Sequence, residues 1–430
     1  MDDHSREADG TPAINAEAAQ PERTPNLKPR ALMPAMNVAN PLPSLRRILC
    51  RCRTPAVLAV IAGLNLVFTS RAFAEQHRPP SPVIAGYVFS RETAFLPGQI
   101  DPHKLTRINF AFAGIQNGRV VVSSPVDAQN LAAVVNLRHE NPSLSVLLSV
   151  GGWLGSASFS DVSLKAESRK VFIDSAMDLI HRYDLDGIDV DWEYPGMAGS
   201  GHPFRAADKQ NFTILMKELR ERFDKETATA GRRLFLTIAA GAFDEYLEHS
   251  EMDKVARYLD TVNLMTYDSY EAGSDAITGN HAPLFTDPAD PKKISADSTV
   301  RSFERAGVPP EKILLGVPFY GRTWGQVQDQ GHGLFQPGKP VPHVEATYSL
   351  ISTTMLDQGF TRYWDAAASV PFLYNAEKRV FVSYEDPESL AAKCSYVRNH
   401  KLGGIMFWEY FSDDTGQLLK TINQSLRPQP

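Results

Sequence analysis

The 430-residue sequence is 43% hydrophobic and 22% charged, a balance that excludes a disordered or fibrous chain. Residues 1–74 hold nine basic and six acidic residues of the totals of 44 and 50, so the remainder carries 35 basic against 44 acidic residues. This acidic body argues against nucleic acid as a partner. The length allows one large α/β domain or two to three smaller ones.

The first 74 residues are predicted to be a leader. A basic segment over 45–53 precedes an apolar run over 56–68, and Ala72-Phe73-Ala74 then supplies an A-x-A site. This order is typical of a secretory signal peptide, cleaved here after Ala74. We therefore expect a secreted protein, extracellular or periplasmic, without stable membrane association after cleavage. A retained N-terminal membrane anchor is the alternative.

The three cysteines point neither to a disulfide nor to a metal. Cys50 and Cys52 lie in the leader, so the processed chain would keep only Cys394 and could form no internal disulfide. A C-x-C pair with no His or Cys nearby is weak support for metal binding.

From residue 82 onward, short segments rich in β-branched and aromatic residues alternate with helical patterns. We predict eight strands, over 83–89, 105–113, 144–153, 185–195, 234–242, 261–268, 312–324 and 402–410. Helical patterns between them include 163–183, 209–224 and 387–400. Repeated β-then-α alternation over this length indicates a parallel barrel, but a doubly wound sheet produces the same alternation.

One connection is too long for a simple loop. About 60 residues separate Trp324 from the helix predicted at 387–400, and they contain strand-like segments at 372–375 and 379–385. A connection of this length usually has a function or forms a small inserted domain. We predict an insertion over 325–385, which divides the main domain into 82–324 and 386–430.

Three carboxylates recur at every second position in 185–195. Because successive strand residues point to opposite faces, Asp189, Asp191 and Glu193 share one face, and apolar residues occupy the other. Like charges at such spacing resist full ionisation, so at least one pKa should rise, as a general acid at neutral pH requires. A structural acidic patch or a Ca²⁺ or Mg²⁺ site is the alternative explanation.

The segment DGIDVDWEYP (186–195) resembles the D-x-x-D-x-D-x-E signature of glycoside hydrolase family 18, the chitinases and chitinase-like proteins. Four other strands carry motifs similar to the family's, with Ser149, Gly151 and Gly152 in LSVGGW, Met265, Tyr267 and Asp268 in LMTYD, Tyr320 and Arg322 in GVPFYGRTW, and Trp408 in GGIMFWEY. The resemblance spans about residues 82–425. It implies a (β/α)₈ TIM barrel with a small α+β insertion domain.

The resemblance also implies a substrate-assisted, retaining hydrolysis of β-1,4-linked N-acetylglucosamine chains. The sugar's own acetamido oxygen would attack the anomeric carbon and form an oxazolinium ion, so no metal or cofactor is needed. Glu193 would act as general acid and base, Asp191 would hold the acetamido N–H, and Asp189 would share a proton with Asp191. Tyr267 would bind the acetamido carbonyl oxygen. Chitin or chito-oligosaccharide would be the partner, and we expect a monomer.

The remaining candidates are expected to bind sugar. Asp268 and Arg322 would grip hydroxyl groups, and the other members would line the cleft: Tyr87, Phe112, Trp153, Tyr194, Met265, Tyr320 and Trp408. Core packing is the alternative for each aromatic residue. Trp192 and Asp186 fall outside the active face and are expected to be structural, as are Ser149, Gly151 and Gly152.

Two features depart from the family pattern. The segment after Asp268 has Tyr270 but no Trp, and no chitin-binding module is evident. We therefore expect soluble oligomers or loose chains rather than crystalline chitin. The alternatives are an endo-β-N-acetylglucosaminidase, an enzyme acting on peptidoglycan, and a non-catalytic chitin-binding lectin on the same barrel.

Overall fold

The computed structural model describes residues 81–341 and 346–427. The predicted leader, with its cleavage site and the first two cysteines, lies outside these residues. No helix within them is long and apolar enough to cross a membrane.

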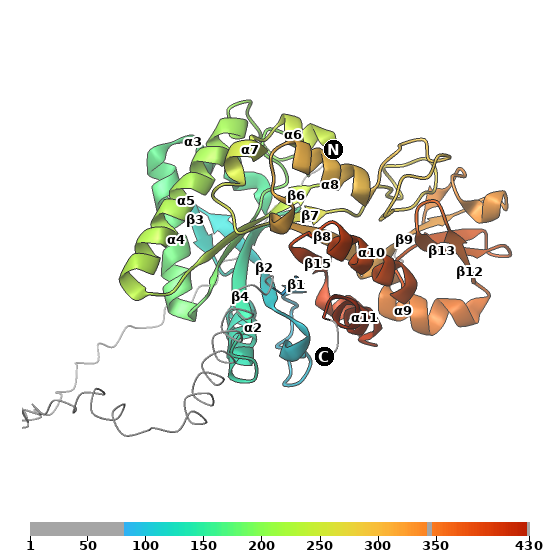
Figure 1. The fold of residues 1–430 in the computed structure, drawn as a ribbon, viewed down its shortest axis with the longest axis horizontal. Coiled ribbons are helices and arrows are strands. Elements are labelled where there is room, and N and C mark those ends of the chain that lie inside the picture. Colours follow the sequence, from blue (N-terminus) through green and yellow to red (C-terminus); the bar gives the residue numbers. More distant parts are fainter. Residues whose placement is uncertain (1–80, 342–345, 428–430) are drawn as a thin grey trace, which may run out of the picture. The chain divides into compact units, whose positions relative to one another are not determined.

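Eight parallel strands close into a barrel (Figure 1). In chain order they are β1 (Val83–Phe89), β2 (Arg107–Gln116), β4 (Ser145–Gly151), β5 (Gly187–Asp191), β6 (Phe235–Gly241), β7 (Thr261–Met265), β8 (Ile313–Pro318) and β15 (Gly404–Trp408). Each pairs in parallel with its neighbours, and β1 pairs with both β2 and β15. This closure excludes the doubly wound sheet, and each of the eight predicted segments contains one strand of the barrel. The short β3 (Arg119–Val121) pairs antiparallel with the end of β2.

Helices surround the barrel. They are α2 (Pro125–Asn136), α3 (Phe159–Leu164), α4 (Ala166–Tyr183), α5 (Asp208–Ala230), α6 (Asp244–Glu248), α7 (Met252–Val255), α8 (Ala296–Arg305), α10 (Pro387–Asn399) and α11 (Gln417–Leu426). Local sequence explains the start of α10: the Asp386 carboxylate accepts the backbone N–H groups of Glu388 and Ser389, and Pro387 occupies the first helical position, where no donor is needed.

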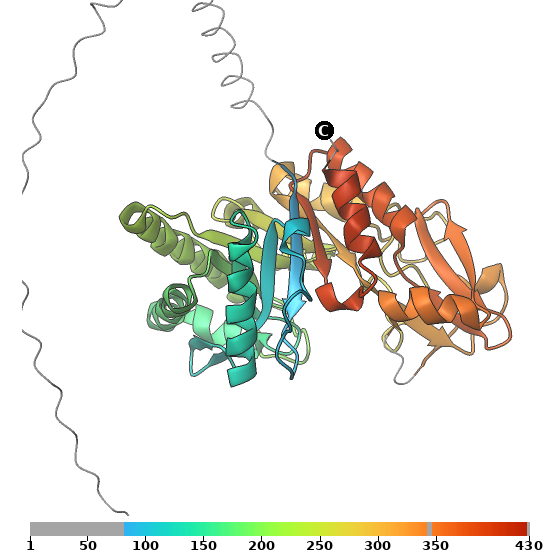
Figure 2. The same cartoon turned by 90° about the horizontal axis from the view of Figure 1, so that it is seen from below.

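A second, antiparallel sheet lies between β8 and β15 in the chain. It contains β9 (Tyr320–Gly325), β10 (Lys339–Pro340), β11 (Ala346–Thr347), β12 (Thr361–Asp365), β13 (Val370–Asn375) and β14 (Val380–Ser383), with the short α9 (Tyr348–Leu350) beside it. Figures 1 and 2 show this sheet and helices α4 and α5 at opposite ends of the described body. The α+β insertion is thus confirmed.

The strand predicted over 312–324 is two strands. β8 ends at Pro318, and β9 begins at Tyr320 and pairs with β14 rather than with the barrel. Apolar composition continues across both, so the sequence pattern does not mark the change of sheet. As a result, Tyr320 and Arg322 stand where the insertion sheet meets the barrel.

Candidate active site

The carboxylate series lies on β5 and just beyond its carboxyl end. Asp189, Asp191 and Glu193 are all buried. Ile188 and Val190 belong to the main apolar core, which includes residues of the surrounding helices, as the alternation predicts. The site therefore lies at the end of the barrel where the fold places catalytic groups.

Asp189 is held by hydrogen bonds from four other strands. Tyr87 Oη and Ser149 Oγ each lie 2.8 Å from its Oδ2, and Asn263 Nδ2 lies 3.1 Å from its Oδ1, which also accepts from the Thr237 hydroxyl. Burial raises the pKa of Asp189, and these donors offset part of that rise. Because each oxygen has two partners, Asp189 is engaged in the barrel interior, and no hydrogen bond joins it to the next carboxylate in the described residues.

Asp191 and Glu193 are less completely satisfied. Burial, followed by the charges of Glu193 and Asp189, raises the pKa of Asp191 well above its usual range, and its Oδ1 has no hydrogen-bond partner among the described residues. Ser156 Oγ accepts the Glu193 backbone N–H at 2.9 Å and lies 3.0 Å from the Asp191 carbonyl oxygen. The backbone is therefore fixed, while the carboxyl groups retain capacity for a ligand.

The two glycines at the end of β4 allow its close approach to β5. A Cβ atom on Gly151, which has φ +112°, would lie 2.1 Å from the Asp191 carbonyl oxygen. A Cβ atom on Gly152 would lie 2.7 Å from the Phe112 ring. A side chain at Gly151 would displace β5, and one at Gly152 would displace the Phe112 ring, so both glycines have structural roles.

Glu193 should set the alkaline limit of activity. Burial raises its pKa to about 7, and the nearby Asp268 charge adds to the rise. A general acid must be protonated, so kcat/KM should fall about tenfold per pH unit above pH 7. The Asp268→Asn variant should move this limb to lower pH, since it removes an anion that disfavours ionisation of Glu193. Initial rates between pH 4 and 9 on a fluorogenic chitobioside test the fall of kcat/KM above pH 7 and its displacement in Asp268→Asn. A limb that stays in place in Asp268→Asn would contradict the charge coupling.

Asp268 is bound to Arg322 and Tyr320 across the boundary between barrel and insertion. Arg322 reaches both of its carboxylate oxygens, with Nε 2.8 Å from Oδ1 and Nη2 2.6 Å from Oδ2, and Tyr320 Oη lies 2.9 Å from Oδ2. Burial alone would raise the pKa of Asp268, but His281 and Arg322 outweigh it, and the pKa lies well below its ordinary value. Asp268 is therefore a permanent anion at this site.

The predicted sugar-binding aromatics form two groups. Phe112 stacks on Trp408 with ring centroids 5.4 Å apart, and Tyr87 lies 5.8 Å from Trp408. Separately, Trp153 meets Tyr194 edge-to-face at 6.4 Å. The Trp153 side chain is half exposed, so it is available to a ligand.

Two candidates lie close to the first aromatic group. Met265 and Tyr267 pack, together with Trp408, against the small apolar cluster inside the barrel. Burial, followed by the Asp191 charge, raises the pKa of the Tyr267 phenol well above its usual range. Tyr267 is therefore a neutral hydrogen-bond donor at the site.

Sequence reasoning missed several residues that the fold brings here. Phe89 is 43% exposed, and its ring lies 5.9 Å from that of Trp408 and 6.2 Å from that of Phe112. Thr237 and Asn263 hold Asp189, and His281 lies beside Asp268. Alternation along β1 places Phe89 on the same face as Tyr87, a signal that could have identified it. No group of His, Cys, Asp or Glu suited to a metal ion occurs in the part of the chain that the structure describes.

The sequence profile of Glycosyl hydrolases family 18 matches residues 83–413. The chain belongs to this family. It is a chitinase-like glycoside hydrolase on a TIM barrel. The described acidic strand, the glycine pair and the inserted sheet thus all fall inside the family's matched region.

Relatives and solved structures agree with this assignment. Chitinase A1 of Niallia circulans is 36% identical over 76% of this chain and 55% of its own length. Chitotriosidase-1 of Mus musculus is 32% identical over 74% of this chain and 69% of its own length. A family 18 N-acetylglucosaminidase structure from Paenibacillus barengoltzii is 40% identical over 80% of this chain and 99% of that chain, with a TM-score of 0.73. The chain therefore spans only about half the length of the first of these relatives.

Proposed function

We propose that the protein is a secreted, monomeric chitinase that hydrolyses β-1,4-linked N-acetylglucosamine chains by the substrate-assisted, retaining route. The observation that carries the proposal is the pairing of a protonatable Glu193 with a buried Asp191 whose Oδ1 has no partner in the described residues. Such an oxygen can accept the acetamido N–H of a sugar bound beside Glu193.

Each step can be assigned to a described side chain. Glu193 gives its proton to the departing glycosidic oxygen while the acetamido oxygen bonds to the anomeric carbon, closing the oxazolinium ring. The resulting Glu193 carboxylate then takes a proton from the water that opens this ring. Asp191 accepts the acetamido N–H, which carries part of the positive charge of the intermediate, through the Oδ1 atom that lacks a partner within the described residues, and Tyr267 donates to the acetamido group. The intramolecular nucleophile replaces a second enzymatic carboxylate, with a large effective concentration.

The substrate contacts follow from the same geometry. Trp408 and Phe112 offer stacked apolar surface to the sugar whose bond is cut, because both lie against the barrel-interior cluster next to Tyr267. Tyr194 follows Glu193 in the chain and its ring meets that of Trp153, so we assign this pair to the departing sugar. Arg322 and Asp268 offer charged groups to hydroxyls.

Product analysis tests this function. Chitohexaose incubated with the full chain should be cleaved, and the first product should carry the β-anomeric configuration, as judged by mass spectrometry and proton NMR. Fully deacetylated hexaglucosamine should remain intact, because it lacks the acetamido nucleophile. Equal cleavage of the two oligomers would contradict the mechanism.

One solved relative suggests a second product pattern, which the same assay can detect. The solved neighbour with 40% identity is described as an N-acetylglucosaminidase. Release of single N-acetylglucosamine units from chitohexaose, in place of dimers and longer fragments, would assign that activity to this chain. Cleavage of a glycoprotein N-glycan instead would favour the endoglycosidase alternative, and binding without turnover would favour the lectin.

A further inference from the structure

Residues 280–282 connect the active site with the insertion sheet and α10. Three consecutive residues are each anchored to a different element: Asn280 Nδ2 to Asp365 Oδ2 at the end of β12 (2.6 Å), the His281 backbone N–H to Ser383 Oγ at the end of β14 (2.9 Å), and the Ala282 carbonyl oxygen to Lys393 Nζ on α10 (2.6 Å). The Ser269 N–H also donates to the His281 carbonyl oxygen at 3.0 Å, which joins this segment to the residue after Asp268.

The His281 side chain is directed at Asp268. It is completely buried, its Nδ1 lies 3.5 Å from Asp268 Oδ1, and its ring centroid lies 5.4 Å from that of Tyr320. Neither ring nitrogen makes a hydrogen bond of normal geometry within the described residues, so the approach of Nδ1 to Asp268 is a close contact rather than a formed hydrogen bond. A buried imidazole nitrogen requires a partner, and the Asp268 carboxylate is an acceptor that Nδ1 approaches.

The charges around the ring determine its protonation state. Burial lowers the pKa of His281, and although Asp268 favours the charged form, Arg322 and Lys393 oppose it. A neutral imidazole carries one N–H, and placing it on Nδ1 lets the ring donate to Asp268 without adding a buried charge. Arg322 and Tyr320 already bind Asp268 from the insertion side, so His281 would complete its set of donors.

We propose that His281 is a positioning residue that acts through Asp268. Its Nδ1–H fixes the carboxylate of Asp268 so that this group presents Arg322 and Tyr320 to the sugar and keeps its negative charge near Glu193. Because residues 280–282 are anchored to β12, β14 and α10, the docking of the insertion sheet contributes to this position. The inference rests on the proposed function, since Asp268 matters there as a substrate-facing group.

A pair of substitutions separates donation from packing. His281→Leu fills the space but cannot donate, whereas His281→Asn places an amide N–H near the original Nδ1. We expect kcat/KM on a fluorogenic chitobioside to fall about tenfold or more in the Leu variant, the usual consequence of losing a hydrogen bond to a charged group, and to stay within about twofold of wild type in the Asn variant. Thermal denaturation of both variants confirms that they are folded.

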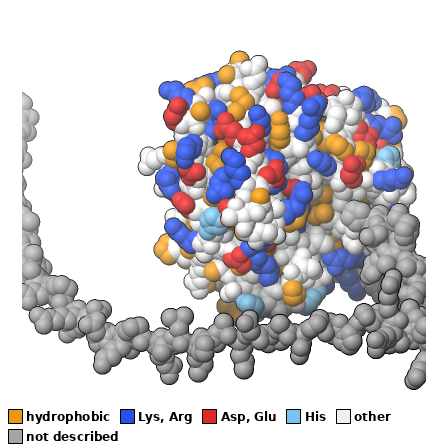
Figure 3. All heavy atoms as spheres, turned by 60° about the vertical axis from the view of Figure 1, so that its left-hand side comes forward, with side chains coloured by type: hydrophobic (Ala, Val, Ile, Leu, Met, Phe, Trp, Pro, Cys, Tyr) orange, Lys and Arg blue, Asp and Glu red, His pale blue; other side chains and the backbone are white. Residues whose placement is uncertain are grey.

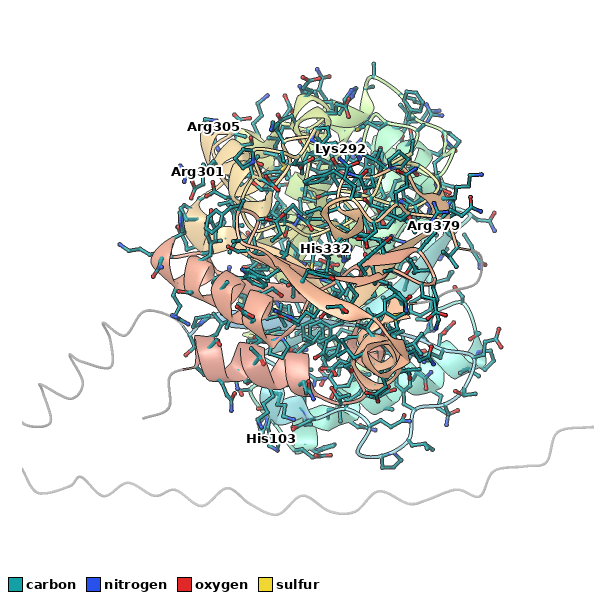
Figure 4. All side chains as sticks on the ribbon, turned by 90° about the vertical axis from the view of Figure 1, so that its right-hand side faces the viewer. His103, Lys292, Arg301, Arg305, His332 and Arg379 are labelled. Atoms are coloured by element: carbon teal, nitrogen blue, oxygen red, sulfur yellow. The ribbon has the colours of Figure 1, made fainter. Side chains whose placement is uncertain are left out.

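His332 provides a matched control. Its Nδ1 also lies near an aspartate, 3.7 Å from Asp329 Oδ1, but its side chain is half exposed on the insertion (Figure 4). His332→Leu should keep wild-type kcat/KM. Equal loss in His281→Leu and His281→Asn at similar melting temperatures would overturn the proposal, as would full activity of the Leu variant.

One further measurement does not depend on turnover. Nitrogen-15 NMR of histidine-labelled protein should show His281 as the neutral tautomer protonated at Nδ1, and a proton on Nε2 instead would overturn the inference even if no variant could be purified. If the wild type cleaves no chito-oligomer, the proposed function fails by itself, and this NMR result still decides whether His281 can donate its Nδ1–H to Asp268.

Discussion

Glu193→Gln should reduce kcat on chitohexaose by about 10³-fold or more. The substitution keeps the shape of the side chain and removes the proton donor, which alone contributes roughly 10²–10⁴-fold in enzymes. Here the same group also activates water in the second step, so two steps lose their catalyst. Binding of chitohexaose should persist, because the substitution leaves in place the aromatic and charged side chains that are proposed to contact the sugar. Single-turnover kinetics measure the loss of catalysis, and calorimetry measures the binding of chitohexaose.

The same substitution should stabilise the fold at alkaline pH. Burial raises the pKa of Glu193 to about 7, above its unfolded value of about 4.3. Between these values the folded state keeps a proton that the unfolded state releases, so stability falls as pH rises. Gln cannot ionise, and the melting temperature of the variant at pH 8 should exceed that of wild type by a few degrees.

A control and an opposing outcome complete this test. Glu218 is a glutamate on α5 that pairs with Arg169 away from β5, and Glu218→Gln should retain wild-type turnover. Wild-type turnover in Glu193→Gln would refute its role as the general acid. Loss of both turnover and oligomer binding, with the fold intact, would show instead that Glu193 acts mainly in binding.

The sequence predicted the parts of the site that lie close together in the chain. Alternation within DGIDVDWEYP placed Asp189, Asp191 and Glu193 on one face, because the strand period depends only on local geometry. The eight strands were recognised for the same reason. The distinction between a barrel and an open sheet was not local, since it depends on β1 pairing with β2 and β15.

The support around Asp189 could not be predicted in this way. Its partners Tyr87, Ser149, Thr237 and Asn263 come from four strands, and only closure of the barrel brings them to one carboxylate. The expectation that Asp189 shares a proton with Asp191 came from the family resemblance. In the structure both oxygens of Asp189 bind these four donors, and no hydrogen bond to Asp191 occurs within the described residues, so the expectation stays a prediction.

The charges on the molecular surface indicate little about the function. On the face shown in Figure 3, basic and acidic side chains are intermixed rather than gathered into regions of one sign. Exposed ion pairs of this kind contribute little to stability, because solvent screens them. The groups with the strongest electrostatic consequences lie elsewhere: the Asp268 cluster is partly exposed beside the active site, and the pair formed by Lys393 and Glu385 is completely buried.

Lys393→Met should destabilise the protein by about 3–5 kcal/mol. Lys393 and Glu385 are both completely buried and form an ion pair, with Glu385 also accepting the Ser389 hydroxyl at 2.5 Å. Removing the ammonium group leaves a carboxylate in a site where burial already raises its pKa. The Ala282 carbonyl oxygen loses its partner at the same time. The expected result is a fall of roughly 5–10 °C in melting temperature, measured at pH 7.

Two further variants decide whether the pair itself carries this effect. The double variant Glu385→Leu/Lys393→Met should recover at least half of the lost stability, because an apolar pair leaves no uncompensated charge. Lys170→Met, which removes a cation from the exposed pair of Lys170 with Asp174, should change stability by less than about 0.5 kcal/mol. If the double variant loses as much stability as Glu385→Leu and Lys393→Met lose separately when added together, the two charges act independently. In that case the cost would arise from lost packing at the junction of α10 and the insertion sheet.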